Sequence, residues 1–464
     1  MDPILIGEAL AVLMFVGIIG VLMLGFPAAF TLAGTSLIFA AIGYGLGAFD
    51  PSNLGSVANR YVGFMTNEVL VAVPLFIFMG VMLESSKIAE QLLVTMGRLF
   101  GTLRGGLGLS VILVGALLAA STGIVGATVV TMGLLSLPAM MRAGYDPKLA
   151  TGVIAASGTL GQIIPPSTVL IFMGDMLAGM NAQVQMAKGN FAPTAISVGD
   201  LFAGAFLPGL LLVALYSLWV VAKAIFDPKS CPALVVTAEE RANLGRDVVV
   251  ALLPPLLLIV AVLGSILTGI ATPTEAASVG AVGAIVMALA RGRLSLSSLQ
   301  HVTMTTALIT SMVFVIIFGA AVFSIVFRML GGDKLVEDLL SQFPGGVTGA
   351  VIAVMLLMFV LGFILDTFEI IFIVIPITAP ALLAMDVSPL WLGVMVGMNL
   401  QTSFLTPPFG FALFYLRGVT PASIGTGQLY RGVIPFVALQ VIAIVTLFIF
   451  PGLATWLPEV VFGN

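Results

Sequence analysis

Residues 138–166, PAMMRAGYDPKLATGVIAASGTLGQIIPP, return without a gap as residues 380–408, PALLAMDVSPLWLGVMVGMNLQTSFLTPP. The prolines at positions 138, 147, 165 and 166 all recur 242 residues later, which is the difference between 380 and 138. Proline breaks helices, and matched interruptions in two halves of an apolar chain are typical of transporters that bind substrate between repeats. The repetition therefore predicts a transporter made of two related halves.

The composition places the chain in a membrane. Of its 464 residues, 60% are apolar and 8% are charged, which is too little charge to cover a soluble surface. Uncharged windows of about 20 residues can cross about 30 Å of hydrocarbon as helices. Three such windows are residues 202–221, 248–267 and 433–451. Helices are expected because lipid offers an exposed backbone no partner, and the polar-apolar alternation of a barrel is missing. We predict an all-α, multi-pass membrane protein.

The longest polar stretch, residues 223–247, divides the chain. It contains four basic residues, so the positive-inside rule places it in the cytoplasm. We therefore expect a first repeat at residues 1–222, a cytoplasmic connector at residues 223–247 and a second repeat at residues 248–464.

Charges at equivalent turns predict that the repeats are inverted. Arg142 and Lys148 border the first turn of the repeated stretch, whereas the second copy has only Asp386 there. Basic residues favour the cytoplasmic side, so the two copies of this turn face opposite sides of the membrane. In this topology an extra polar segment at residues 181–200 faces outside. Arg328 and Lys334 also face outside, as an exception to the positive-inside rule, although Glu337 and Asp338 dilute their charge.

Each repeat is expected to contain a re-entrant hairpin. The apolar segment between Arg104 and Arg142 is longer than one crossing needs, yet both of its ends carry positive charge. A hairpin that returns to the same side explains this, with small and hydroxyl residues capping its two half-helices. The predicted hairpins cover about residues 105–141 and 345–385, with tips near residues 120–126 and 362–367. A broken helix follows each hairpin, at about residues 149–180 and 389–417.

The proline pairs suggest ion binding. Two successive prolines remove two backbone donors and leave carbonyl oxygens unpaired, and broken-helix transporters bind Na⁺ with such oxygens and nearby hydroxyls. We therefore predict one Na⁺ site in each repeat, with an anionic substrate held beside the half-helix ends. The alternative, in which each pair only kinks a packed helix, stays open. The predicted substrate contacts are Gly123, Ser157, Thr367, Asn399 and Thr402.

Asp366 lies in the apolar second hairpin, where an ionisable group is costly unless it is paired or faces water. It is a candidate partner for a cation or a proton. The alternative is that it caps a half-helix at the hairpin tip, and Glu369 can share either role. Asp175 falls near a predicted segment end, where we expect ordinary solvation.

Other functions lack their motifs. The chain has no Gly-x-x-x-x-Gly-Lys-Ser/Thr loop for ATP and no His-Glu-x-x-His zinc motif, and its single cysteine excludes an intrachain disulfide. Its net charge of −4, with scattered basic residues, gives no support to nucleic-acid binding. An intramembrane enzyme or a channel needs a catalytic dyad or a charged pore ring, and neither is recognisable. We therefore expect a non-enzymatic transporter in a lipid bilayer, driven by an ion gradient or by a partner.

Four stretches resemble a known family. They are residues 138–146, 158–167, 201–209 and 451–458, which read PAMMRAGYD, GTLGQIIPPS, LFAGAFLPG and PGLATWLP. With them the chain resembles, nearly end to end, the large membrane subunit of tripartite ATP-independent periplasmic (TRAP) transporters. The resemblance implies a secondary transporter of the bacterial inner membrane that takes up organic acids with Na⁺. It also implies a periplasmic substrate-binding protein, a small four-helix membrane subunit, and elevator motion of the hairpins and broken helices against a scaffold.

The resemblance also implies ligands for two Na⁺ ions. The first site would use the hairpin tip at Ser121 and Thr122, and the second the Asp366 region. Many members have Ser-Gly-Ser at the first tip, where this chain reads Ser121-Thr122-Gly123, and Ser403 replaces a frequent glycine. The remaining implied ligands are the Gly161, Ile164 and Pro166 carbonyls in the first site and Ser403, Thr406 and Phe409 in the second.

A stand-alone Na⁺-coupled carboxylate symporter is the alternative reading, because distantly related carriers of that kind share the architecture. Such a symporter would need no binding protein.

Overall fold

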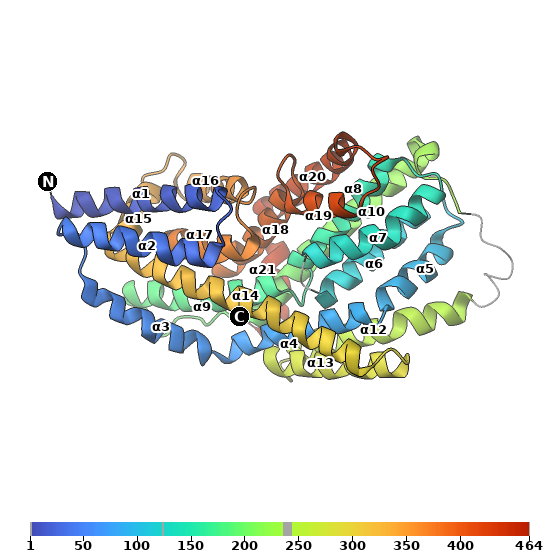
Figure 1. The fold of residues 1–464 in the computed structure, drawn as a ribbon, viewed down its shortest axis with the longest axis horizontal. Coiled ribbons are helices and arrows are strands. Elements are labelled where there is room, and N and C mark those ends of the chain that lie inside the picture. Colours follow the sequence, from blue (N-terminus) through green and yellow to red (C-terminus); the bar gives the residue numbers. More distant parts are fainter. Residues whose placement is uncertain (1, 123–124, 235–243, 464) are drawn as a thin grey trace. The chain divides into compact units, whose positions relative to one another are not determined.

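The computed structural model describes residues 2–122, 125–234 and 244–463, which form helices joined by turns and contain no strand (Figure 1). The predicted all-α, multi-pass architecture is confirmed, since ten of the described helices are long and apolar enough to cross a membrane. They are α1 (Pro3–Met23), α2 (Ala28–Gly45), α4 (Glu68–Ser85), α7 (Val125–Arg142), α10 (Val198–Phe226), α12 (Leu244–Leu267), α13 (Pro273–Ala290), α14 (Leu296–Met329), α17 (Thr367–Ala384) and α20 (Thr426–Ile449).

The remaining described helices are mostly shorter and connect or flank these spans. They are α3 (Gly55–Met65), α5 (Ile88–Phe100), α6 (Gly106–Thr122), α8 (Pro147–Thr159), α9 (Thr168–Ala187), α15 (Gly332–Ser341), α16 (Gly346–Leu361), α18 (Pro389–Leu405), α19 (Phe411–Val419) and α21 (Gly452–Phe462), with 3₁₀ turns η1 (Pro51–Leu54), η2 (Leu160–Gln162) and η3 (Pro228–Ser230).

Local side chains explain where several helices begin. Asp146 caps α8 by accepting a 2.8 Å hydrogen bond from the backbone N–H of Lys148, and Pro147 then supplies a preset backbone angle at the first position. A capping box between Ser197 and Asp200 starts α10. These caps satisfy backbone donors that have no partner within the helix.

The first residues of the predicted connector belong to α10. The helix α10 continues through Phe226, because Lys223 pairs with Asp227 at 3.3 Å and lies 5.8 Å from the centre of the Trp219 ring. An i,i+4 ion pair and a cation over an aromatic face both stabilise the last helical turn. Residues 235–243, in the middle of the predicted connector, lie outside the described residues.

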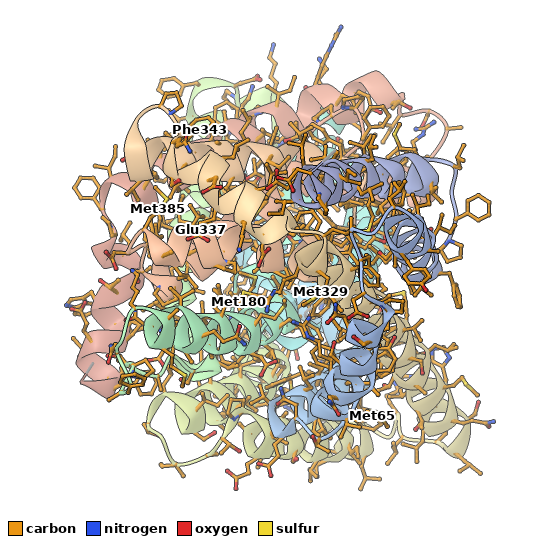
Figure 2. All side chains as sticks on the ribbon, turned by 90° about the vertical axis from the view of Figure 1, so that its left-hand side faces the viewer. Met65, Met180, Met329, Glu337, Phe343 and Met385 are labelled. Atoms are coloured by element: carbon orange, nitrogen blue, oxygen red, sulfur yellow. The ribbon has the colours of Figure 1, made fainter. Side chains whose placement is uncertain are left out.

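The chain forms two compact units, and each unit takes segments from both predicted repeats. The first consists of Met1–Leu70, Asp175–Ile196 and Leu308–Leu392. Within it α1 packs on α2 and α15, and α17 packs on α15 and α16. Figure 2 shows Met65 of α3, Met180 of α9 and Met329 of α14 in this unit.

Polar contacts join segments of the first unit that are distant in sequence. The Tyr61 hydroxyl of α3 donates to the Phe318 carbonyl of α14 at 3.1 Å. Lys188, just after α9, pairs with Asp386 at 2.5 Å and also donates to the Leu383 carbonyl at 3.3 Å. The lysine charge therefore lies against the C-terminal carbonyls of α17, where a cation is favoured.

The second unit consists of Val71–Gly174, Ser197–Ala307 and Gly393–Asn464. In it α8 contacts α6, α7 and α20. The contact with α20 is close because both helices have glycine there. A Cβ on Gly152 would lie 2.2 Å from the Gly432 carbonyl oxygen, and a Cβ on Gly432 would lie 2.2 Å from the Lys148 carbonyl oxygen. Small residues of this kind allow two membrane helices to approach backbone to backbone.

Gly152→Ala should lower the free energy of unfolding by about 1–3 kcal/mol, because the new methyl group overpacks the α8–α20 contact. The measurement is the Tm of the purified chain in detergent. Gly34→Ala in α2 is the control, since nothing lies within 4 Å of its Cβ position and alanine is the better helix former. Equal Tm values for the two variants would contradict the close packing of α8 on α20.

Candidate ion and substrate sites

The first proline pair interrupts its helix. The helix α8 ends at Thr159, η2 follows, and α9 begins only at Thr168, with a cis peptide bond between Pro165 and Pro166. The two prolines lack the N–H groups that would pair with the Gly161 and Gln162 carbonyls four residues earlier.

A side chain replaces one of the two missing donors. The Ser167 hydroxyl donates to the Gln162 carbonyl at 2.9 Å. Among the described residues no group donates to the Gly161 carbonyl. One buried oxygen therefore remains available where the sequence predicts a Na⁺ ligand.

The two helices of the first predicted hairpin, α6 and α7, both pack on α8 and on η2. A Cβ on Gly161 would lie 3.6 Å from Cα of Ala119, so the end of α6 approaches the break. Ser121 and Thr122 end α6, but their side chains and all of Gly123 lie outside the described residues. The structure thus brings the hairpin to the break, and the role of its tip stays a prediction.

The other residues predicted around the first break lie in or next to the interruption. Pro166 is buried and Ile164 is half-buried in the interruption itself. Ser157 is fully buried one turn earlier and donates to the Ile154 carbonyl at 3.1 Å. A Cβ on Gly115 of α6 would lie 2.6 Å from the Ser157 Cβ. The position of Ser157 therefore serves the packing of α6 on α8, and its contact with substrate stays a prediction.

The second proline pair interrupts its helix in the same way. The helix α18 ends at Leu405 and α19 begins at Phe411, with a cis peptide bond between Pro407 and Pro408. The donors lost here are those for the Ser403 and Phe404 carbonyls. The Thr406 N–H donates to the Ser403 carbonyl at 3.2 Å instead. The Phe404 carbonyl accepts no hydrogen bond within the described part of the chain.

Four of the residues predicted from sequence share one helical face at this break. Asn399, Thr402, Ser403 and Thr406 are spaced three, four and seven residues from the first, and the first three are buried. The hydroxyls of Thr402, Ser403 and Thr406 donate to helix carbonyls at 3.0, 2.8 and 2.7 Å. A hydroxyl oxygen that donates its hydrogen still has lone pairs, so these oxygens can also face a cation. Phe409 has an exposed ring, so its predicted contribution is its carbonyl.

The second predicted hairpin lies in the first compact unit. The helices α16 and α17 pack together, and Asp366 stands between them as the N-cap of α17. Its carboxylate accepts the Thr367 N–H at 2.7 Å, while its own N–H donates to the Glu369 carboxylate at 3.0 Å. The alternative that Asp366 caps a half-helix is therefore confirmed, and Thr367, the first residue of α17, is buried. A role for Asp366 toward Na⁺ stays a prediction.

Sequence reasoning missed a contact between repeat-equivalent positions. The Gln401 side-chain amide donates to the Thr159 hydroxyl at 3.3 Å and lies 3.5 Å from the Tyr216 hydroxyl. Positions 159 and 401 differ by 242, the offset of the proline pairs, so the two interrupted helices meet at equivalent residues. The signal in the sequence was a glutamine inside an apolar helix, which is costly unless it has a partner.

The expectation for Asp175 was wrong. This carboxylate is half-buried and accepts a 2.8 Å hydrogen bond from the Asn67 side chain. The position of Asp175 near the predicted end of a segment did not reveal that α3 and α4 bring Asn67 beside it.

The known proteins that resemble this chain are transporters. The C4-dicarboxylate TRAP transporter large permease protein DctM of Vibrio cholerae is 28% identical to this chain, and the match covers 97% of this chain and 98% of that protein. The isethionate TRAP transporter permease protein DctMQ of Oleidesulfovibrio alaskensis is 31% identical over 90% of this chain and 63% of its own length. The crystal structure of the Alcanivorax borkumensis YdaH transporter matches 86% of this chain and 87% of its own, with a TM-score of 0.61 at 16% identity.

The YdaH likeness supports the fold alone, whereas the sequence matches identify the family. The family profile described as "Tripartite ATP-independent periplasmic transporter, DctM component" matches residues 15–453. The ten candidate spans agree with a permease component. The chain is therefore a multi-pass protein of the bacterial inner membrane and belongs to the DctM component family of TRAP transporters.

Proposed function

We propose that this chain carries a small organic acid into the cell together with Na⁺. The observation that carries the proposal is the pair of matched helix breaks, at Pro165-Pro166 and Pro407-Pro408, each beside a carbonyl oxygen that accepts no hydrogen bond among the described residues. Oxygens of neutral carbonyls and hydroxyls suit a monovalent hard cation, which does not need the carboxylate-rich shells of calcium sites.

The two breaks would build one Na⁺ site each. In the first, the Gly161, Ile164 and Pro166 carbonyls would act with Ser121 and Thr122. In the second, Ser403, Thr406 and the Phe409 carbonyl would act with the Asp366 region. Binding at both breaks would couple the Na⁺ gradient to uptake, since the chain has no ATP-binding loop of its own.

The proposal includes inverted repeats and elevator-type alternating access. The Gln401–Thr159 contact supports the repeats, because equivalent positions of two symmetry-related elements meet only near their symmetry axis. In a transporter with inverted repeats, the binding site between the repeats can open to either side of the membrane.

The substrate class and the partners follow from the family and from the relatives. Two relatives bear names that refer to C4-dicarboxylates and isethionate, which are small organic anions. The DctMQ relative is longer than this chain, which covers 63% of it, so part of it has no counterpart here. We propose that a separate small membrane subunit fills that role and that a periplasmic binding protein delivers the acid.

The test is uptake of radiolabelled succinate into proteoliposomes that contain the chain and its small subunit. Uptake should require both an inward Na⁺ gradient and the cognate binding protein. Uptake with Na⁺ alone would instead identify a stand-alone symporter, and uptake indifferent to Na⁺ would reject the coupling.

Asp366→Asn should raise the Na⁺ concentration for half-maximal uptake about tenfold, because a charge-assisted contact is lost. Asparagine caps helices as well as aspartate does, so α17 should keep its start. The matched control is Asp146→Asn at the N-cap of α8, which changes the same atoms away from both predicted sites. An unchanged Na⁺ dependence in Asp366→Asn would remove Asp366 from the second site.

Pro165→Ala and Pro407→Ala should each weaken Na⁺ binding several-fold. Alanine at 165 restores an N–H that can pair with the Gly161 carbonyl, and alanine at 407 restores a second donor to the Ser403 carbonyl, beside the Thr406 N–H at 3.2 Å. Each new donor competes with the ion. The control is Pro254→Ala inside α12, where the proline lies within one continuous helix. Na⁺ affinities equal to wild type in both variants would contradict the proposal that Na⁺ binds at the helix breaks.

A further inference from the structure

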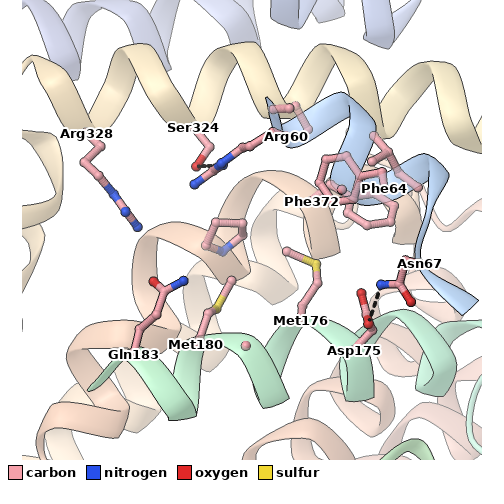
Figure 3. A pocket seen from close by; sticks show the side chains of 16 residues that line it. Arg60, Phe64, Asn67, Asp175, Met176, Met180, Gln183, Ser324, Arg328 and Phe372 are labelled. Carbon is pink, nitrogen blue, oxygen red and sulfur yellow. Dashed lines mark hydrogen bonds between the residues drawn. The ribbon is translucent and has the colours of Figure 1, made fainter. Parts of the chain in front are cut away.

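A cavity of about 330 Å³ with polar residues in its lining lies within the first compact unit. The helices α3, α9, α14 and α17 line it (Figure 3). Arg60 of α3, Arg328 of α14 and Gln183 of α9 point into the same space in this view. Arg60 is half-buried, where a charged side chain is costly without a partner, whereas Arg328 is exposed and pairs with Asp333 at 3.9 Å.

The Arg60 guanidinium lacks an anionic partner. It donates to the Ser324 hydroxyl at 3.2 Å, and no carboxylate lies within 4.0 Å of it among the residues that the structure describes. Burial, and to a smaller extent the charge of Arg328, lower the pKa of Arg60, although arginine still keeps its proton at any working pH. A half-buried guanidinium with one neutral acceptor leaves most of its five donors unused.

The carboxylates near the cavity do not occupy the terminal nitrogens of these two arginines. Asp333 lies 3.9 Å from Nε of Arg328, which leaves the terminal nitrogens of that guanidinium available. Asp175 is bonded to Asn67, and in Figure 3 it lies on the far side of Met176 from both guanidinium groups. One end of the cavity is therefore rich in donors, and Met176, Met180 and Phe372 give it apolar walls.

Chain topology puts this end of the cavity on the outer side. Arg293 precedes α14 in a basic stretch that the positive-inside rule places in the cytoplasm. The 34 residues of α14 rise roughly 50 Å at about 1.5 Å per residue, more than the hydrocarbon thickness. Arg328, at the other end of α14, therefore emerges on the periplasmic side.

We propose that this cavity is an outward-facing carboxylate site, in which Arg60 and Arg328 bind the incoming organic acid. The planar guanidinium fork matches a carboxylate, so each arginine can form two parallel hydrogen bonds. The Ser324 hydroxyl and the Gln183 amide add neutral polar groups, while the methionines and Phe372 cover the apolar part of the acid. The identity of the acid rests on the proposed function, but the anion chemistry of the cavity does not.

The test uses a cysteine at the cavity rim. Cys231 is the single cysteine and is replaced by serine, and Gln183→Cys then gives an exposed thiol beside Arg328 in the full-length chain. The measurement is the rate of labelling by a membrane-impermeant maleimide added from outside, with and without succinate and in the absence of Na⁺. Succinate should slow labelling of Gln183→Cys and leave an Asn190→Cys control unchanged.

Arginine variants make the test specific. Arg60→Gln and Arg328→Gln should each raise the succinate concentration for half-protection about tenfold, since a charge-assisted contact is lost. Arg60→Lys keeps the charge but loses the fork, so it should fall between wild type and Arg60→Gln. Arg293→Gln removes an exposed arginine elsewhere and should behave as wild type. Equal protection by succinate in all four variants would overturn the site.

A lipid headgroup is the competing source of negative charge. Labelling is therefore compared in phosphatidylethanolamine vesicles with and without phosphatidylglycerol. Protection by phosphatidylglycerol but not by succinate would overturn the carboxylate assignment. If uptake depends on Na⁺ but succinate does not slow the labelling of Gln183→Cys, only the cavity proposal is rejected. If succinate slows the labelling but uptake does not depend on Na⁺, the cavity proposal is supported and only the Na⁺ coupling is rejected.

Discussion

The structure depends on four proline nitrogens that carry no hydrogen. Inside a membrane a helix must satisfy its own backbone, and the pairs at 165–166 and 407–408 prevent this in two places. Local groups repair part of the loss, since the Ser167 hydroxyl donates to the Gln162 carbonyl and the Thr406 N–H donates to the Ser403 carbonyl at 3.2 Å. The carbonyls that remain are buried hard oxygens. Under the proposed function, an ion would supply these oxygens with the partner that the chain does not provide.

The proposed transport separates two kinds of chemistry. Cation binding would rely on neutral oxygens at the helix breaks, whereas anion binding would rely on guanidinium groups at the outward-facing cavity. In both cases a charged solute would exchange its water for fixed polar groups of the chain, which lowers the cost of bringing the charge into the membrane. The Gln401–Thr159 contact joins the two interrupted helices at equivalent positions.

Sequence reasoning succeeded where the controlling chemistry is local. Proline lacks a donor in any environment, so the breaks after Thr159 and Leu405 could be predicted, and Asp366 could be recognised as a possible cap three residues before Glu369. It failed where distant segments meet. Nothing in the chain order reveals that Arg60 and Arg328 share a cavity or that Asn67 reaches Asp175. The ion ligands proposed at the first hairpin tip, Ser121 and Thr122, still rest on family resemblance.

The most direct test of the central claim is equilibrium binding of radioactive Na⁺ to the purified full-length chain. The account predicts at least two saturable sites per chain, one lost on changing each proline pair, because each break supplies its own oxygens. Binding of one ion or none, or two ions that survive the loss of both proline pairs, would contradict the claim that the helix breaks are the Na⁺ sites.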